Sequence, residues 1–233
     1  MQESQAQETQ ELVQKYNKVC FLNPMYKMIP TQFHQSMLGL VTSLFQHGFK
    51  VAGLMTDSSI LPTCRNSLVE VAHTLYEEER PDLYLWVDSD QVFNFNHFMH
   101  LLYHYDMSDD VHVLAARALI KNMDAPGICA YIRGKNGSYC SVSPNLTNIQ
   151  EVDAVGLGFC LVSPKLMEDM YAKHGKRQFM FTWEGDGVLG EDFYWCNLVR
   201  ELGHKVYVDN TVTVGHYGVP LDENFLINFQ KKE

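Results

Sequence analysis

Two aspartates separated by one residue, Asp88 and Asp90, are the side chains whose types and spacing suggest chemistry most directly. They follow the apolar run from Leu83 to Val87, which predicts a strand covered on both faces. In open α/β sheets, ligands bind beyond the carboxyl ends of the strands. The pair therefore predicts a magnesium or manganese site, in which one carboxylate binds the metal and the other contacts the metal or a ribose, with diphosphate oxygens completing the shell. The alternative is a solvated turn, because Asp and Ser favour turns.

Three more chemically capable side chains stand at the ends of predicted elements. Glu191 and Asp192 follow Gly190 and open a helix predicted over 191–202, where the helix dipole by itself favours acidic residues. His216 ends the last predicted strand, and a histidine there is either a structural residue or a metal ligand. Taken singly, each of these residues has an ordinary structural explanation.

The segments that must position these residues alternate between strand and helix patterns. We expect strands at 18–22, 50–55 and 83–87. Apolar residues at 37, 40, 41, 44 and 45 indicate a first helix between these strands, which Gly48 ends. A loop is expected at 56–64. Apolar residues at 68, 71, 72 and 75 then indicate the second helix. This order is typical of a parallel sheet with right-handed crossovers.

The second half of the chain mixes shorter patterns. We expect strands at 111–116, 128–133, 138–142, 155–162, 205–208 and 211–214. One helix begins at Ser163 and Pro164, and the helix over 191–202 closes at Gly203. We therefore predict a single α/β domain with a mixed, mostly parallel sheet flanked by helices. Its parts are a polar tail or frayed helix at 1–16 and a domain at 17–233, with a nucleotide-binding half at 17–110, an acceptor-binding and catalytic half at 111–218 and a C-terminal tail at 219–233.

The composition limits the classes of binding partner that we expect for this protein. The 28 acidic and 18 basic residues give a net charge of -10, which argues against nucleic acid or anionic lipid as a partner. The sequence has no apolar run long enough for an integral membrane segment and no apolar core of a signal peptide at its start, so we expect a soluble, cytoplasmic protein, in the host cytoplasm if it is viral. Its six cysteines contain no C-x-x-C pair, which favours reduced thiols over a zinc site.

The ordered set of motifs resembles a known enzyme family. It comprises Arg65-Asn66, Asp88-Ser89-Asp90, Gly156-Leu157-Gly158, Gly190-Glu191-Asp192 and a late His216. Over roughly residues 18 to 218 the chain resembles the Rossmann-like GT-A fold glycosyltransferases, especially the small inverting family-two-like enzymes of large DNA viruses and bacteria. The resemblance implies transfer of a sugar from a nucleotide-sugar donor to an acceptor hydroxyl, with Mn²⁺ or Mg²⁺ required.

The same resemblance implies roles for single residues. Asp88 and Asp90 match the D-x-D motif, with Asp90 as the direct metal ligand and Asp88 as a ribose or metal contact, and His216 matches a histidine that completes the metal site in some members. Asp192 matches the general base, with Glu191 or Asp186 as the alternative. Arg65 matches a contact to the nucleotide or its phosphates, although a solvated helix face would equally suit an arginine.

Two more positions belong to the expected donor site. Asp57 would contact the base or ribose, or else be an ordinary loop acid. Gly158 would let the backbone approach the donor sugar, or would permit a bulge. The G-x-G lacks the third glycine of a dinucleotide fingerprint, so a nicotinamide cofactor is not expected.

The expected function is thus a metal-dependent hexosyltransferase-like enzyme. Its donor would be a UDP-sugar, or a GDP-sugar as second choice. Its acceptor would be a hydroxyl of a glycan, protein or small molecule, which attacks the anomeric carbon of the donor sugar with inversion. One rival is a sugar-phosphate nucleotidyltransferase, which would carry a glycine-rich basic loop where this chain has residues 23–28. The other is a non-catalytic nucleotide- or sugar-binding domain of the same fold.

Overall fold

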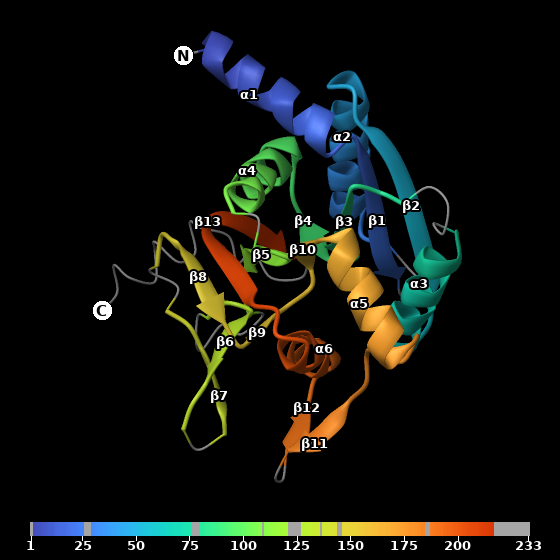
Figure 1. Ribbon diagram of the computed structural model, residues 1–233, viewed down its shortest axis with the longest axis vertical. Coiled ribbons are helices and arrows are strands. Elements are labelled where there is room, and N and C mark those ends of the chain that lie inside the picture. The colour runs from blue at the N-terminus through green and yellow to red at the C-terminus, as the bar shows by residue number, and fades with distance from the viewer. Residues whose placement is uncertain are drawn as a thin grey trace.

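A central sheet of eight strands organises the computed structural model, which describes residues 2–25, 29–75, 80–108, 110–120, 127–135, 137–143, 146–184 and 187–216 (Figure 1). The helices are α1 (Gln2–Lys15), α2 (Thr31–Gln46), α3 (Leu61–Leu75), α4 (Phe95–Asp106), α5 (Pro164–His174) and α6 (Glu191–Glu201). The strands of the central sheet are β1 (Lys18–Met25), β2 (Lys50–Asp57), β3 (Leu83–Val87), β4 (Gln91–Val92), β5 (Val113–Ala118), β8 (Ile149–Val152), β10 (Phe159–Val162) and β13 (Val206–His216). Smaller sheets are formed by β6 (Ala130–Arg133), β7 (Tyr139–Ser141) and β9 (Ala154–Val155), and by β11 (Thr182–Glu184) with β12 (Gly187–Leu189).

Most strands of the central sheet run in one direction. Its order is β2-β1-β3-β10-β5-β13-β4, with β8 paired to β13. The pairs β1–β2, β1–β3 and β5–β13 are parallel, and β10 is antiparallel to both β3 and β5. The five strands β2, β1, β3, β5 and β13 therefore share one direction, which confirms the predicted mixed, mostly parallel sheet.

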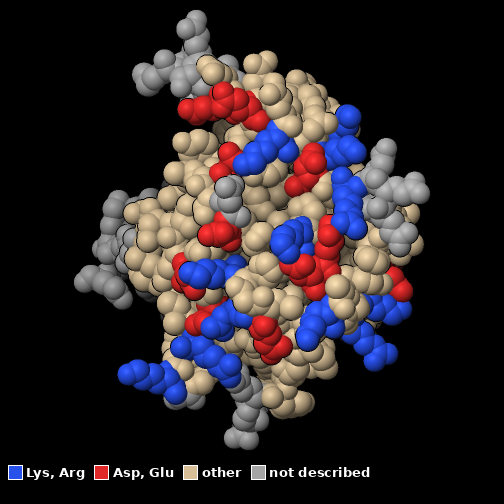
Figure 2. All heavy atoms as spheres, viewed as in Figure 1, with Lys and Arg blue, Asp and Glu red and all other residues tan. Residues whose placement is uncertain are grey.

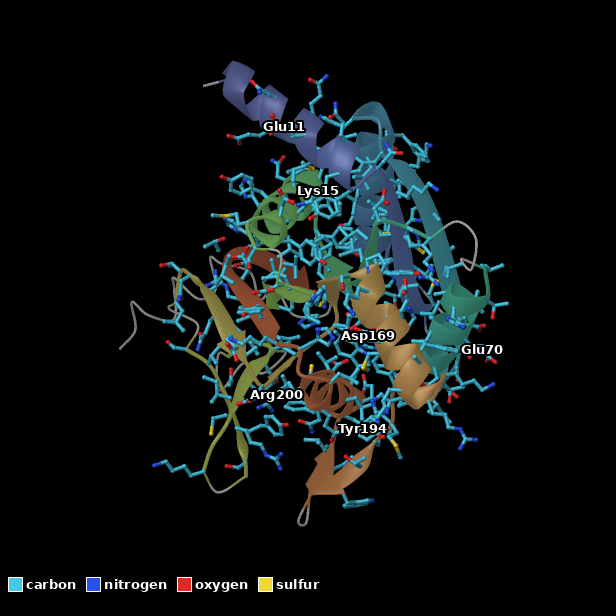
Figure 3. All side chains as sticks on the ribbon, viewed as in Figure 1. Glu11, Lys15, Glu70, Asp169, Tyr194 and Arg200 are labelled. Carbon is cyan, nitrogen blue, oxygen red and sulfur yellow. The ribbon has the colours of Figure 1, made fainter. Side chains whose placement is uncertain are left out.

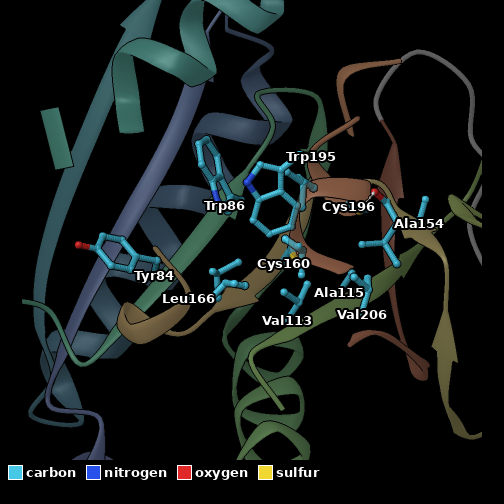
Figure 4. Packing of buried hydrophobic residues seen from close by; sticks show 14 of the residues in the cluster. Tyr84, Trp86, Val113, Ala115, Ala154, Cys160, Leu166, Trp195, Cys196 and Val206 are labelled. Atoms are coloured by element: carbon cyan, nitrogen blue, oxygen red, sulfur yellow. Dashed lines mark hydrogen bonds between the residues drawn. The ribbon is translucent and has the colours of Figure 1, made fainter. Parts of the chain in front are cut away.

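The sheet is covered by helices on both faces, as the alternation of its side chains requires. Leu83, Leu85 and Val87 of β3 face the core shared with α1, α2 and α4, whereas Tyr84 and Trp86 face the core shared with α3, α5 and α6. Figure 4 shows Trp86 and Trp195 close together in the second core, beside Cys160 and Leu166. Burial on both faces explains why this strand is apolar throughout.

The N-terminal segment forms a helix that is attached to the domain. Leu12 of α1 is buried, and Lys15, whose side chain is labelled in Figure 3, donates to Asp106 of α4 at 2.5 Å. Tyr16 donates to the same carboxylate at 2.8 Å. Of the two states expected for residues 1–16, the helix is the one observed.

The surface charge and the helices concern two expectations, namely that nucleic acid is not a partner and that the chain has no integral membrane segment. In the view of Figure 2, acidic and basic side chains are interspersed, and the basic ones do not merge into one broad area. Among the residues that the structure describes, no helix is both long enough and apolar enough to cross a membrane.

Several segments differ from the prediction, and strands β4, β8, β11 and β12 were not predicted. The loop expected at 56–64 is shorter, because β2 continues to Asp57 and α3 begins at Leu61. The strand expected at 155–162 is divided by residues 156–158 into β9 and β10, which belong to different sheets. The two expected terminal strands form the single strand β13, with a register shift between Asp209 and Thr213. Helix α4 was not predicted.

Candidate functional site

The predicted D-x-D segment lies at the carboxyl edge of the central sheet. Asp88 follows β3 directly, and its backbone N–H donates to the Gly158 carbonyl at 3.0 Å. The turn then closes through the Gln91 N–H, which donates to the Asp88 carbonyl at 3.2 Å. This edge is where an open α/β sheet binds its ligands.

A buried guanidinium gathers three carboxylates at this edge. We call Arg65, Asp88, Glu191 and Asp192 the Arg65 cluster. Arg65 Nη2 donates to both oxygens of Asp88 at 2.9 and 3.0 Å, and Nη1 donates to Asp192 Oδ1. Glu191 Oε1 lies 3.9 Å from Nη2. The cluster thus joins the second turn of α3, the end of β3 and the first turn of α6.

The surroundings of Arg65 fix its position. Its side chain is 0% exposed, and the guanidinium carbon lies 5.8 Å from the Trp86 ring centre and 5.5 Å from that of Phe179. The Asn66 amide oxygen accepts from the backbone N–H groups of Gln178 and Phe179, and its amide nitrogen donates to the Phe179 carbonyl. Arg65 therefore neither lies on a solvated helix face nor presents an accessible group to a phosphate.

Charge balance within the cluster explains its ionisation. Burial alone would lower the pKa of Arg65, but the carboxylates of Asp192, Asp88 and Glu191 outweigh it and raise that pKa. Burial raises the pKa of Asp192 to about 7, with a further contribution from Glu191 and Asp88, although Arg65 opposes the shift. The Asp192 side chain keeps 22% of its surface exposed, against 9% for Glu191. Asp192 is thus the more accessible carboxylate of the two proposed bases.

Asp90 and His216 form a second, adjacent pair. Asp90 Oδ1 lies 4.0 Å from His216 Nε2, and the two side chains are 38% and 13% exposed. They meet because β4, which starts at Gln91, pairs with the end of β13 so that Gln91 is opposite His216. This strand pairing brings Asp90, from the first half of the chain, close to His216, the last residue that the structure describes.

The donor set of this pair suits a divalent cation. His216 Nδ1 contacts the Leu119 carbonyl oxygen, which can only accept, so Nδ1 carries a proton and the lone pair of the neutral ring is on Nε2, facing Asp90. Asp88 differs, because both of its oxygens accept from Arg65. Within the described part of the chain, no group of three or more His, Cys, Asp or Glu side chains is arranged to hold a metal ion. A cation held by Asp90 and His216 would take its other ligands from a substrate, as Mg²⁺ sites commonly do.

The remaining predicted residues lie at different distances from this centre. Gly158 is at the centre, beside Gln91, and accepts the Asp88 N–H. Asp57 is the exposed last residue of β2, two strands from β3 and therefore about 10 Å away. Asp186, the alternative base, lies outside the described residues.

Comparisons with known proteins concern the fold. No family model and no curated protein sequence matches the chain. Among solved structures, it is similar to A197 from STIV, with 14% identity and a TM-score of 0.55 over 88% of this chain and 87% of that one. This chain and A197 share a fold.

Two further structures have weaker similarity. One is the catalytic domain of Drosophila beta1,4-galactosyltransferase 7 in complex with xylobiose, with 16% identity and a TM-score of 0.47 over 93% of this chain and 81% of that one. The other is CMP:2-keto-3-deoxy-manno-octonic acid synthetase in complex with CTP, with 11% identity and a TM-score of 0.44 over 92% of this chain and 97% of that one.

Two residues of the site had no role in the sequence-based prediction. Asn66 was noticed only as the partner of Arg65 in a dipeptide, and its three hydrogen bonds to residues 178 and 179 depend on contacts that a sequence does not display. Gln91 carried a usable signal, since it is a polar residue placed directly between Asp90 and the apolar pair Val92 and Phe93. A buried amide in that place needs a polar neighbour.

Proposed function

We propose that the protein is a glycosyltransferase that moves a sugar from a nucleotide-sugar donor to an acceptor hydroxyl. The observation that carries this proposal is the convergence of the Arg65 cluster with the Asp90–His216 pair at the carboxyl edge of the sheet. Such a transfer needs a cation site and a general base next to each other. The Asp90–His216 pair suits a cation, and Asp192 beside it is an accessible carboxylate with a raised pKa. The fold shared with A197 is compatible with it.

Asp192 is the proposed general base. The acceptor oxygen attacks the anomeric carbon of the donor as Asp192 takes the hydroxyl proton, so a C–O bond forms to the acceptor. The bond from the anomeric carbon to the phosphate oxygen breaks, and the nucleoside diphosphate leaves with that electron pair. Displacement from the opposite face gives inversion.

Asp90 and His216 would hold Mn²⁺ or Mg²⁺, which when bound neutralises charge on the diphosphate. Arg65 keeps Asp88 and Asp192 in fixed positions on either side of its guanidinium. Because Arg65 is fully buried and already bonded to carboxylates, its proposed role is positioning rather than phosphate binding. UDP is the first nucleotide to test and GDP the second. Asp57, the exposed last residue of β2, is proposed to contact a more distant part of the donor.

The nucleotidyltransferase alternative lacks a supporting feature. Such an enzyme would be expected to carry a glycine-rich basic loop after the first strand, but Asn23 and Pro24 are part of β1, and Asn23 is buried. A non-catalytic domain of this fold would bind the nucleotide without turnover, so the experiment below also tests that alternative.

The experiment is a donor panel that measures release of UDP or GDP with Mn²⁺, Mg²⁺ or EDTA, followed by tests of two variants. Asp90→Ala should weaken metal-dependent nucleotide binding, whereas Asp192→Asn should keep binding and slow transfer by about 10² to 10⁴-fold. Asp169→Asn, which changes a partly exposed acid of α5 that pairs with Lys165 and His204, is the matched control. If no donor is turned over, or if Asp192→Asn is as fast as the wild type, the proposal is wrong in whole or in the identity of the base.

A further inference from the structure

Gln91 occupies the position where the two parts of the site meet. Its backbone N–H closes the turn onto the Asp88 carbonyl, and in the β4–β13 pairing it is opposite His216. Its side chain is fully buried, and its amide Nε2 donates to Asp90 Oδ1 at 3.4 Å. Oδ1 is the same oxygen that lies 4.0 Å from His216 Nε2.

A leucine of similar size would fill this position at lower cost if packing were its only purpose. The amide is completely buried, and its Oε1 has no hydrogen-bond partner among the described residues. Burying a polar group with such poor compensation is unfavourable. The cost is understandable if the amide acts on Asp90, the charged group that Nε2 touches.

Gly158 provides the space that the amide needs. A Cβ built on Gly158 would lie 2.7 Å from Gln91 Nε2, 2.9 Å from Cδ and 3.3 Å from Cγ. All three of these contacts are with one side chain, so a methyl group at position 158 would displace the Gln91 amide first. Since the amide is enclosed, that displacement would move it relative to Asp90.

We propose that Gln91 is a positioning residue that is seated against Gly158 and orients the Asp90 carboxylate towards His216 for cation binding. This proposal rests on the proposed function, because it assumes that a cation binds at Asp90 and His216. It also gives Gly158 a role that does not involve the donor sugar: glycine is needed there to accommodate the amide.

The test measures Mn²⁺ affinity by electron paramagnetic resonance, in the presence of UDP, rather than turnover. Gln91→Leu keeps a side chain of similar size but removes the amide, and Gly158→Ala keeps the amide but displaces it. Each should weaken Mn²⁺ binding by about tenfold or more, the usual effect of losing a residue that orients a metal ligand. If Gln91→Leu does not fold, Gly158→Ala tests the same contact with Gln91 present.

Two further variants make the test specific. The double variant Gly158→Ala with Gln91→Ala should bind Mn²⁺ no more weakly than Gln91→Ala alone, because the methyl group then has space and the amide is already absent. Gly156→Ala is the matched control: its Cβ would meet Cys129 Cβ at 3.0 Å and not Gln91, so it can lower the melting temperature while Mn²⁺ affinity stays within about twofold of the wild type.

The outcomes separate the two proposals. Wild-type protein that binds neither UDP nor Mn²⁺ refutes the proposed function and this inference with it. Wild-type protein that binds both, while Gln91→Leu binds Mn²⁺ equally well, refutes only the role of Gln91. Additive losses from the Gly158→Ala and Gln91→Ala changes would likewise show that the two residues act separately.

Discussion

Asp192 combines partial exposure with a pKa that suits a base near neutrality. Burial raises its pKa to about 7 from an ordinary value of 3.8. A protonated carboxyl group cannot accept the acceptor's proton, so transfer should slow as the pH falls below about 7, by about tenfold per unit. We expect kcat plotted against pH to show this acidic limb in wild-type protein. The limb should disappear in the residual activity of Asp192→Asn, and its persistence there would assign the titration to another group.

Arg65 should contribute to stability as well as to positioning. Arg65→Met would leave Asp88, Asp192 and Glu191 close together without their cation, and loss of one partner of a buried ion pair costs about 3–5 kcal/mol. Arg200→Met is the matched control. Arg200, which is labelled in Figure 3, is 39% exposed in its pair with Asp153, and ion pairs with an exposed partner are worth about 0–1 kcal/mol. Urea denaturation of the two variants measures the difference. Equal losses would mean that the Arg65 cluster is not a coupled unit.

At the scale of elements, the sequence predicted the strands and helices whose patterns are local. The apolar run of β3, the Ser163–Pro164 start of α5 and the position of His216 at the end of β13 are all confirmed. Helix α4 was missed although its buried residues 98, 101, 102 and 105 have helical spacing. The burial of Arg65 could not be predicted from a local sequence pattern. Its partner Asp192 is 127 positions away, and no residue near either one indicates that they form a pair.

Helix α4 also provides a prediction about local stability. Its N-cap is Asn94, whose side chain accepts from the His97 N–H while the His97 ring accepts from the Asn94 N–H, each at 3.1 Å. Replacing a capping asparagine by alanine typically costs about 1 kcal/mol. Asn94→Ala should therefore lower the free energy of unfolding by about that amount, measured by urea denaturation. Asn96→Ala, in the first turn of the same helix but not at the cap, should cost less; an equal loss would contradict the capping role.

At the scale of the whole molecule, one sheet carries residues from both predicted halves. Strand β10 of the second half lies between β3 and β5. Arg65 of residues 17–110 meets Asp192 of residues 111–218, and Asp90 meets His216. The division into a nucleotide-binding half and an acceptor-binding half stays a prediction. The site depends on the two halves folding together, because neither contains both the Arg65 cluster and the Asp90–His216 pair.

The net charge of -10 leads to a final prediction about ligand-induced stability. An acidic protein repels a free diphosphate, so UDP should stabilise it strongly only when a cation is bound with it. A ligand present at 100 times its Kd stabilises by about 2.7 kcal/mol, which for a domain of this size raises Tm by about 5–10 °C. We expect a shift of that size with UDP and Mn²⁺ together, little with UDP in EDTA, and little for Asp90→Ala under either condition. Asp169→Asn should behave like the wild type, because its carboxylate is on α5 with Lys165, away from the proposed cation pair. A full UDP shift in EDTA would show that the nucleotide binds without the cation, and that Asp90 and His216 serve some other purpose.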